Sequence, residues 1–190
     1  MTTTANAKFE NTGFSSALVA PDRAAEIPES GDAYGWLIGS WEMDATLHDV
    51  NGPTHKLKGE LHASWILEGR AIQDLFIFPR RADRQSGRPA RDDRYATTIK
   101  TYDRKLRAWR LTFINPASNE TSAQLIARRA GHGIEMEGQL SDATPVRWRY
   151  QSITASSFHY TAEKLNADGK SWHVYLELFG KRSDSQADAA

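Results

Sequence analysis

Cysteine is absent from the 190-residue sequence. The chain therefore forms no disulfide bonds and offers no thiolate ligands to a metal ion. An excess of one charge is also lacking, because 24 Lys and Arg residues balance 24 Asp and Glu residues. A chain without net charge has no general attraction to nucleic acid or to an anionic membrane, and we expect neither as a partner.

Long hydrophobic runs are missing as well. A membrane-spanning helix needs about 20 consecutive apolar residues, and no stretch of the sequence approaches that length. Residues 1–13 lack a basic segment followed by an apolar core. We therefore expect no signal peptide and a cytoplasmic location.

Alternation of apolar and polar residues is the pattern that the sequence does contain. It is clearest between residues 37 and 70, on both sides of Asn51-Gly52. A period of two is typical of β-strands, and Asn-Gly favours a tight hairpin turn. The same alternation predicts further strands at 71–78, 95–102, 108–115, 121–129, 134–140, 146–153, 158–165 and 171–180.

These strands predict an all-β fold. Turn-forming residues separate them, and almost no segment has a helical pattern. Such spacing indicates an antiparallel meander, and closure into a barrel of about eight to ten strands would leave no exposed edges. A barrel of this size encloses an internal cavity. We expect residues 1–33 to form an N-terminal arm, residues 34–182 the barrel, and residues 183–190 a disordered tail.

The predicted loop at 79–94 is long and carries six Arg against three Asp. Loops of this length in a compact domain are typical of function or of mobility. The loop could cover the mouth of the barrel and attract a carboxylate or phosphate group. It could equally be a solvated loop or an oligomer contact.

Aromatic residues dominate the strand faces that the alternation turns inward. Such a lining suits a flat or apolar small molecule, which is the partner we expect. The candidate binding residues on these faces are Trp65, Trp109, Phe113, Asn115, Trp148, Phe158 and Trp172.

The strand at 71–78 has two possible registers. If Glu68-Gly69 is a two-residue turn, Arg70 and Asp74 both point into the barrel. A turn longer by one residue would expose both charges and turn Gln73 inward. We favour the inward register, in which buried charges would be costly unless they are paired or used.

Four inward residues form a candidate catalytic set, namely Asp74, Arg70, Tyr150 and Tyr160. A desolvated carboxyl such as Asp74 could act as a general acid or base. Arg70 would hold an anionic substrate group, and Tyr150 or Tyr160 would donate to developing oxyanion charge. The alternative is a buried polar network that only stabilises the barrel.

A second polar group lies on the last two strands and consists of His159, Glu163, His173, Tyr175 and Glu177. Two His and two Glu could bind a metal or transfer protons. Because they fall on the polar face, outward cross-strand pairs, His159 with Glu177 and Glu163 with His173, are favoured. Haem binding would need an inward His, and none is predicted. We therefore expect no metal and no cofactor.

Two short motifs resemble those of lipocalins and related calycin proteins. Gly39-Ser40-Trp41 opens the first strand, and Lys181-Arg182 closes the last. In that family the cation packs over the Trp at the closed end of the barrel. The resemblance therefore implies a lipocalin-like barrel and no particular activity.

A wider resemblance, over residues 34–182, is to a largely uncharacterised bacterial family of lipocalin-like barrels. It implies the same fold and says almost nothing about chemistry. The segments that carry it include Leu37–Trp41, Leu67–Asp74, Thr101-Tyr102-Asp103, Ile114-Asn115-Pro116, Arg147-Trp148 and Ser171-Trp172.

Three functions are compatible with this sequence. The first is binding of a small apolar or aromatic molecule in the barrel cavity. The second is a cofactor-independent lyase, isomerase, cyclase or decarboxylase that uses Asp74 and Arg70 in the same cavity. The third is a dimeric interaction module, in which Leu75 and Ile77 of the doubly apolar third strand contact a second copy.

Overall fold

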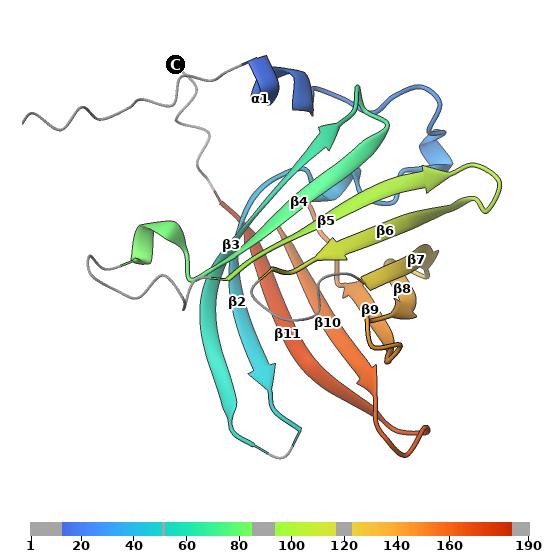
Figure 1. Cartoon of the computed structure of the whole chain (residues 1–190). Coiled ribbons are helices and arrows are strands. Elements are labelled where there is room, and N and C mark those ends of the chain that lie inside the picture. Colours follow the sequence, from blue (N-terminus) through green and yellow to red (C-terminus); the bar gives the residue numbers. More distant parts are fainter. Residues whose placement is uncertain (1–12, 51, 85–93, 117–122, 184–190) are drawn as a thin grey trace, which may run out of the picture.

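The computed structural model of the chain is a closed antiparallel β-barrel (Figure 1). The structure describes residues 13–50, 52–84, 94–116 and 123–183. Within these ranges, ten strands form the barrel wall, and one short strand, β1, extends it at an edge of β3. The predicted all-β meander is confirmed.

The strands in chain order are β1 (Val19–Ala20), β2 (Gly39–His48), β3 (Thr54–Ile66), β4 (Ala71–Phe78), β5 (Arg94–Asp103), β6 (Ala108–Ile114), β7 (Ala123–Ala130), β8 (Gly133–Gln139), β9 (Pro145–Gln151), β10 (Ser157–Leu165) and β11 (Trp172–Arg182). Helical structure in the described ranges is limited to α1 (Gly13–Leu18) and three 3₁₀ turns. These turns are η1 (Glu29–Gly31), η2 (Gly35–Leu37) and η3 (Arg81–Asp83).

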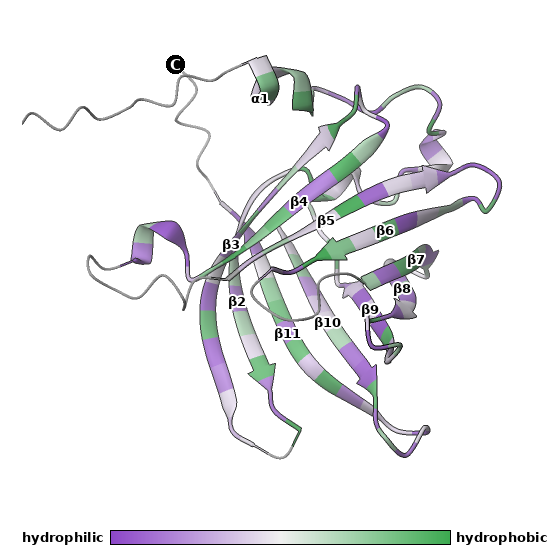
Figure 2. Cartoon of the chain, viewed as in Figure 1, coloured by the Kyte–Doolittle hydropathy of each residue, from purple (hydrophilic) through white to green (hydrophobic). Residues whose placement is uncertain are grey.

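From β2 onward, each strand pairs with the next one along the chain. The last strand, β11, returns to pair with β2 and closes the barrel, with Leu178 opposite Ala45. Hydrophobic and hydrophilic residues alternate along these strands (Figure 2). One set of side chains therefore fills the interior while the other set faces solvent.

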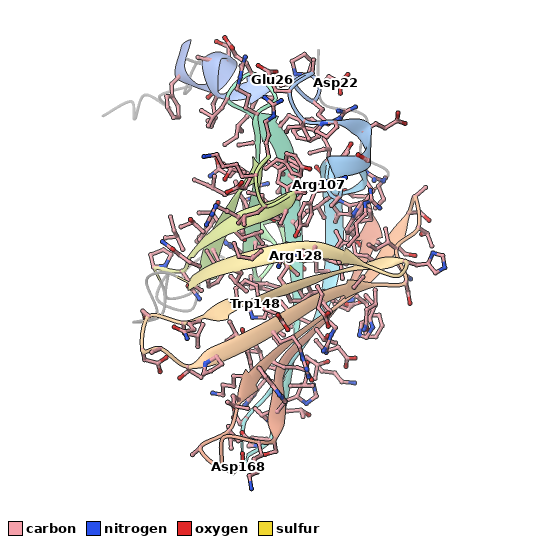
Figure 3. All side chains as sticks on the ribbon, turned by 90° about the vertical axis from the view of Figure 1, so that its right-hand side faces the viewer. Asp22, Glu26, Arg107, Arg128, Trp148 and Asp168 are labelled. Atoms are coloured by element: carbon pink, nitrogen blue, oxygen red, sulfur yellow. The ribbon has the colours of Figure 1, made fainter. Side chains whose placement is uncertain are left out.

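An aromatic core fills one end of the barrel, which we call the closed end. Tyr34 and Trp36, which precede β2, both make edge-to-face contacts with Tyr150. Trp41 packs against Phe158 with 5.1 Å between ring centroids. The N-terminal segment that carries Asp22 and Glu26 and the β10–β11 hairpin that carries Asp168 lie at opposite ends of the molecule (Figure 3).

The contact predicted between Trp41 and the cationic residues that end the last strand is present. The Arg182 guanidinium lies 4.1 Å from the centroid of the Trp41 ring. It also donates hydrogen bonds to the carbonyls of Ile38 and Trp36, at 2.8 and 2.7 Å. Gly39 has φ +118°, and a Cβ there would lie 2.8 Å from an Arg182 nitrogen. Gly39 therefore permits both the local backbone and the approach of the cation.

The register predicted for the third strand is right, but the prediction that Arg70 points inward is wrong. Ala63 pairs with Asp74, as the two-residue turn required. The pairing nevertheless stops at Ile66 and Ala71, and residues 67–70 form a four-residue turn. Arg70 is thus a turn residue on the surface, where it binds Glu26 and Glu68 at 2.9 and 2.7 Å.

A β-bulge in β11 makes the predicted inward position of Trp172 wrong. Ala162 pairs with Leu176 but Glu163 pairs with Val174, so Tyr175 is an extra residue in β11. The extra residue reverses the alternation beyond it. Trp172 therefore lies on the outer face, with the Arg147 guanidinium 4.5 Å from its ring centroid.

Several sequence predictions fall outside the described residues. They concern Asn51 of the first hairpin turn, residues 1–12 of the N-terminal arm, residues 85–93 of the Arg-rich loop and residues 184–190 of the tail. In the part of the chain that is described, no helix combines the length and the apolar character needed to cross a membrane.

Candidate functional site

The barrel encloses a cavity of about 280 Å³. Its wall is mainly aliphatic and aromatic, with a few polar side chains, which is the usual composition of a small-molecule site. The lining residues are Ala45, Leu47, Leu57, Phe76, Phe78, Ala96, Thr98, Lys100, Leu111, Phe113, Asn115, Met136, Leu140, Trp148, Tyr150, Tyr160, Tyr175 and Leu176.

The residues predicted to bind a ligand divide between this cavity and the closed end. Five of the predicted site residues line the cavity, namely Phe113, Asn115, Trp148, Tyr150 and Tyr160. Trp65, Trp109 and Phe158 are buried in the aromatic core instead. The Trp109 indole, for example, donates to the Gly31 carbonyl at 2.8 Å. The roles of all these residues in binding or catalysis stay predictions.

A buried ion pair lies beside the cavity. Asp74 on β4 and Lys100 on β5 are 0 % and 1 % exposed, and the Lys100 ammonium donates to the Asp74 carboxylate. The second carboxylate oxygen accepts the backbone N–H of Thr98 at 3.0 Å. Lys100 lines the cavity, whereas Asp74 lies behind it. The lysine is thus the member of the pair that a ligand would contact.

Burial has the largest effect on the pKa of Lys100. It lowers the pKa of the Lys100 amine, although the Asp74 carboxylate opposes this effect. A charged amine in an apolar site is unfavourable unless a counter-charge and hydrogen bonds stabilise it. Here Asp74 supplies both.

Sequence reasoning missed Lys100. Apolar residues on both faces of β5 leave the direction of Lys100 open in the sequence, and the structure turns Thr98 and Lys100 inward. A signal was nevertheless present. An inward Asp74 requires a cationic partner, and Lys100 is the cation in the middle of the next strand.

Tyrosine hydroxyls supply further polar groups in the cavity wall. Burial raises the pKa of both Tyr150 and Tyr160 well above the usual value, so both phenols stay protonated at neutral pH. Among the described residues, neither hydroxyl has a hydrogen-bond partner, and the rings of both tyrosines pack against neighbouring aromatic rings. A third phenol, Tyr175, accepts the indole N–H of Trp148 at 2.8 Å.

Tyr34 adds a buried phenol between the cavity and the closed end. The Lys100 ammonium lies 5.4 Å from its ring centroid. Its hydroxyl is buried and has no partner in the described structure. Burial raises the pKa of Tyr34 well above its usual value, as does the nearby Asp74 carboxylate. This phenol is therefore neutral and contributes no charge to the site.

The second predicted polar group does not come together as a site. His159 and Glu177 are paired, with 2.8 Å between Nε2 and Oε1, although they are not directly opposite. The predicted pairing of Glu163 with His173 is wrong because the hairpin turn pairs Asn166 with Ser171, one residue later than predicted, so Glu163 lies opposite Val174. Glu163 instead accepts from two arginines, and His173 contacts the His48 carbonyl at 2.8 Å. In the described ranges, no three His, Asp or Glu side chains are placed to hold a metal.

The doubly apolar third strand exposes less than predicted. Leu75 is 42 % exposed, but Ile77 is only 3 % exposed, so its predicted position on a dimer surface is wrong. In β4, Ile77 pairs with Tyr95 of β5 on one side and Glu60 of β3 on the other. A dimer through Leu75 stays a prediction.

Comparison with known proteins shows the fold. Over 83 % of its length, the chain is similar to the S-type phycobiliprotein lyase CPES from Guillardia theta, covering 97 % of that chain with a TM-score of 0.54 and 10 % identity. It is also similar to Rv2717c from M. tuberculosis, again over 83 % of its length and covering 99 % of that chain, with a TM-score of 0.59 and 17 % identity. No family model and no curated protein matches the sequence. These likenesses are consistent with a calycin-like barrel.

Proposed function

We propose that the barrel binds a small apolar or aromatic molecule in its cavity, in contact with Lys100. The observation that carries this proposal is a cavity lined by aromatic and aliphatic side chains with one buried ion pair at its wall. Protein interiors are normally close-packed. A barrel interior that served only folding would therefore be filled, whereas this one keeps a cavity of about 280 Å³.

The size and chemistry of the cavity narrow the ligand. Its volume suits a molecule with one or two aromatic rings. Phe113, Trp148 and Tyr160 provide ring surfaces for stacking or edge-to-face contact. The few polar groups would fix the orientation of the bound molecule, while the apolar wall would provide most of the affinity.

A second candidate is a cofactor-independent enzyme that moves a proton on the same ligand, such as a lyase or isomerase. The observation that favours it is the Lys100 amine, which lines the cavity and contacts the Asp74 carboxylate. Lys100 would take the anion-holding role that Arg70 cannot fill from the surface. The phycobiliprotein lyase likeness, at 10 % identity, supports the barrel and not a shared reaction.

The test is incubation of the purified protein with a small-molecule extract of the source cells, followed by mass spectrometry of the free and bound fractions. Retention of an unchanged compound supports the binding function. Conversion of one compound into another without added cofactor supports the enzyme. If the protein neither retains nor converts any compound, the proposed function is wrong.

Two adjacent residues of β3 provide a matched control. Leu57 lines the cavity, and Lys56 is exposed on the other face. Leu57→Trp should occupy part of the cavity and abolish retention, whereas Lys56→Trp adds the same side chain outside and should bind like the wild type. Equal retention by the two variants would place the ligand elsewhere.

A further inference from the structure

We infer that the cavity selects a neutral aromatic carbonyl compound over an aromatic carboxylate and over a plain hydrocarbon. This inference rests on the proposed binding function and names the chemical class of its ligand. Two independent observations support it, the charge balance of the site and its surplus of hydrogen-bond donors.

The charge balance disfavours an anionic ligand. Lys100 is the one charged side chain among the described cavity-lining residues, and Asp74 already neutralises it. The Lys100 ammonium and the Asp74 carboxylate cancel, so the pair has no net charge. A ligand carboxylate would therefore bring an uncompensated charge into a buried site, which is strongly unfavourable.

The donor surplus disfavours a ligand without polar atoms. An ammonium has three N–H donors, and for Lys100 the partner in the described structure is the Asp74 carboxylate. The hydroxyls of Tyr150 and Tyr160 are protonated and, within the described residues, unpartnered. A hydrocarbon would desolvate these donors without replacing their hydrogen bonds to water, whereas a carbonyl oxygen would accept from them.

Three probes of nearly equal shape separate these alternatives, namely 2-acetylnaphthalene, 2-naphthoate and 2-ethylnaphthalene. Their affinities can be measured by equilibrium dialysis at pH 7.5. We expect 2-acetylnaphthalene to bind the wild type at least about tenfold more tightly than either of the others, the factor that one hydrogen bond to a charged donor contributes.

Variants of the ion pair test the cause of the preference. Asp74→Asn leaves Lys100 without its counter-charge, so the preference should move to 2-naphthoate. The double variant Asp74→Leu/Lys100→Met removes both charges and the main donor. It should bind 2-ethylnaphthalene as tightly as 2-acetylnaphthalene, and it keeps the test valid if Asp74→Asn does not fold.

Each other result overturns the inference. Tightest binding of 2-naphthoate by the wild type would show that the pair does not neutralise the site. Equal binding of 2-ethylnaphthalene would show that the donors do not matter. If none of the probes binds while the protein retains a compound from the cell extract, the ligand class is wrong but the proposed function stands. If the extract also yields nothing, the proposed function itself fails.

Discussion

At the scale of single residues, the Lys100–Asp74 pair distinguishes this barrel interior from a purely apolar one. Both side chains are almost completely buried, and each is the charge partner of the other. Buried pairs rarely add stability relative to apolar residues of similar volume, but breaking one is costly because a lone charge remains. The pair is therefore better explained by a ligand than by the needs of folding.

This explanation predicts a strongly non-additive pair of substitutions. Lys100→Met should lower the free energy of unfolding by about 3–5 kcal/mol, because it leaves Asp74 buried and unpaired. The double variant Asp74→Leu/Lys100→Met should lie within about 1–2 kcal/mol of the wild type. Urea denaturation of the single and double variants measures both values. Additive losses in the double variant would contradict this account.

For Arg70, in contrast to the buried pair, we predict that substitution has almost no effect. It is a surface residue whose partners, Glu26 and Glu68, are also exposed. Exposed ion pairs contribute little, so Arg70→Ala should leave the melting temperature and ligand retention essentially unchanged. A marked loss of ligand retention in this variant would contradict this prediction and show that Arg70 contributes to ligand binding.

At the scale of secondary-structure elements, the strands could be predicted from the sequence because alternation with a period of two is a local property. The boundaries expected for β4, residues 71–78, agree with those observed. Deviations arose where the regular strand pairing ends or is interrupted. The pairing stops before Arg70, which lies exposed in the four-residue turn at 67–70, and the bulge at Tyr175 turns Trp172 to the outer face. Neither leaves a distinct local pattern in the sequence.

The site was partly predictable for the same reason. Tyr150, Tyr160 and Trp148 lie on regular strands whose inward faces are clear from alternation. Lys100 was missed because its strand contains apolar residues on both faces. Its position depends on pairing with β4, where Thr98 lies opposite Asp74. This pairing between strands is a long-range property that neither strand specifies alone.

An element-level prediction concerns the link between β3 and η3. Burial would raise the pKa of Glu60, but hydrogen bonds from the side chain and backbone of Arg81 hold it at about 2, well below the usual 4.5. A lowered folded-state pKa gives stability that is complete above pH 4.5 and is lost as the pH falls toward 2.

Glu60→Gln should therefore reduce the free energy of unfolding at pH 7 by about 1–2 kcal/mol. This predicted loss already allows for solvent screening, because Arg81 is exposed. The difference from the wild type should shrink steadily as the pH is lowered from 4.5 to 2. Denaturation curves at several pH values measure it. A difference that does not change with pH would show that the Glu60 contact is not electrostatic.

At the scale of the whole molecule, the barrel has two parts along its axis. Side chains of the aromatic core fill the closed end, and the cavity lies beyond them. Arg182 joins the last strand to the segment before the first, through its contacts with Trp41, Trp36 and Ile38. Because strands β2 and β11 complete the barrel, this residue stabilises its closure.

Arg182→Ala should lower the free energy of unfolding by about 2–4 kcal/mol, since it removes a cation–π contact and leaves the partly buried carbonyls of Trp36 and Ile38 without this donor. The neighbouring Lys181 is exposed and provides the control, and Lys181→Ala should cost less than about 0.5 kcal/mol. Thermal or chemical denaturation compares them. Equal effects of the two substitutions would show that Arg182 does not specifically stabilise the closure of the barrel.

The central claim is that the cavity holds a ligand against Lys100. A crystal structure of the protein with 2-acetylnaphthalene tests it most directly. We predict the rings among Phe113, Trp148 and Tyr160, with the carbonyl oxygen about 2.7–3.2 Å from the Lys100 ammonium. A ligand bound on the outer surface, or inside the cavity with its carbonyl turned away from Lys100, would contradict this account.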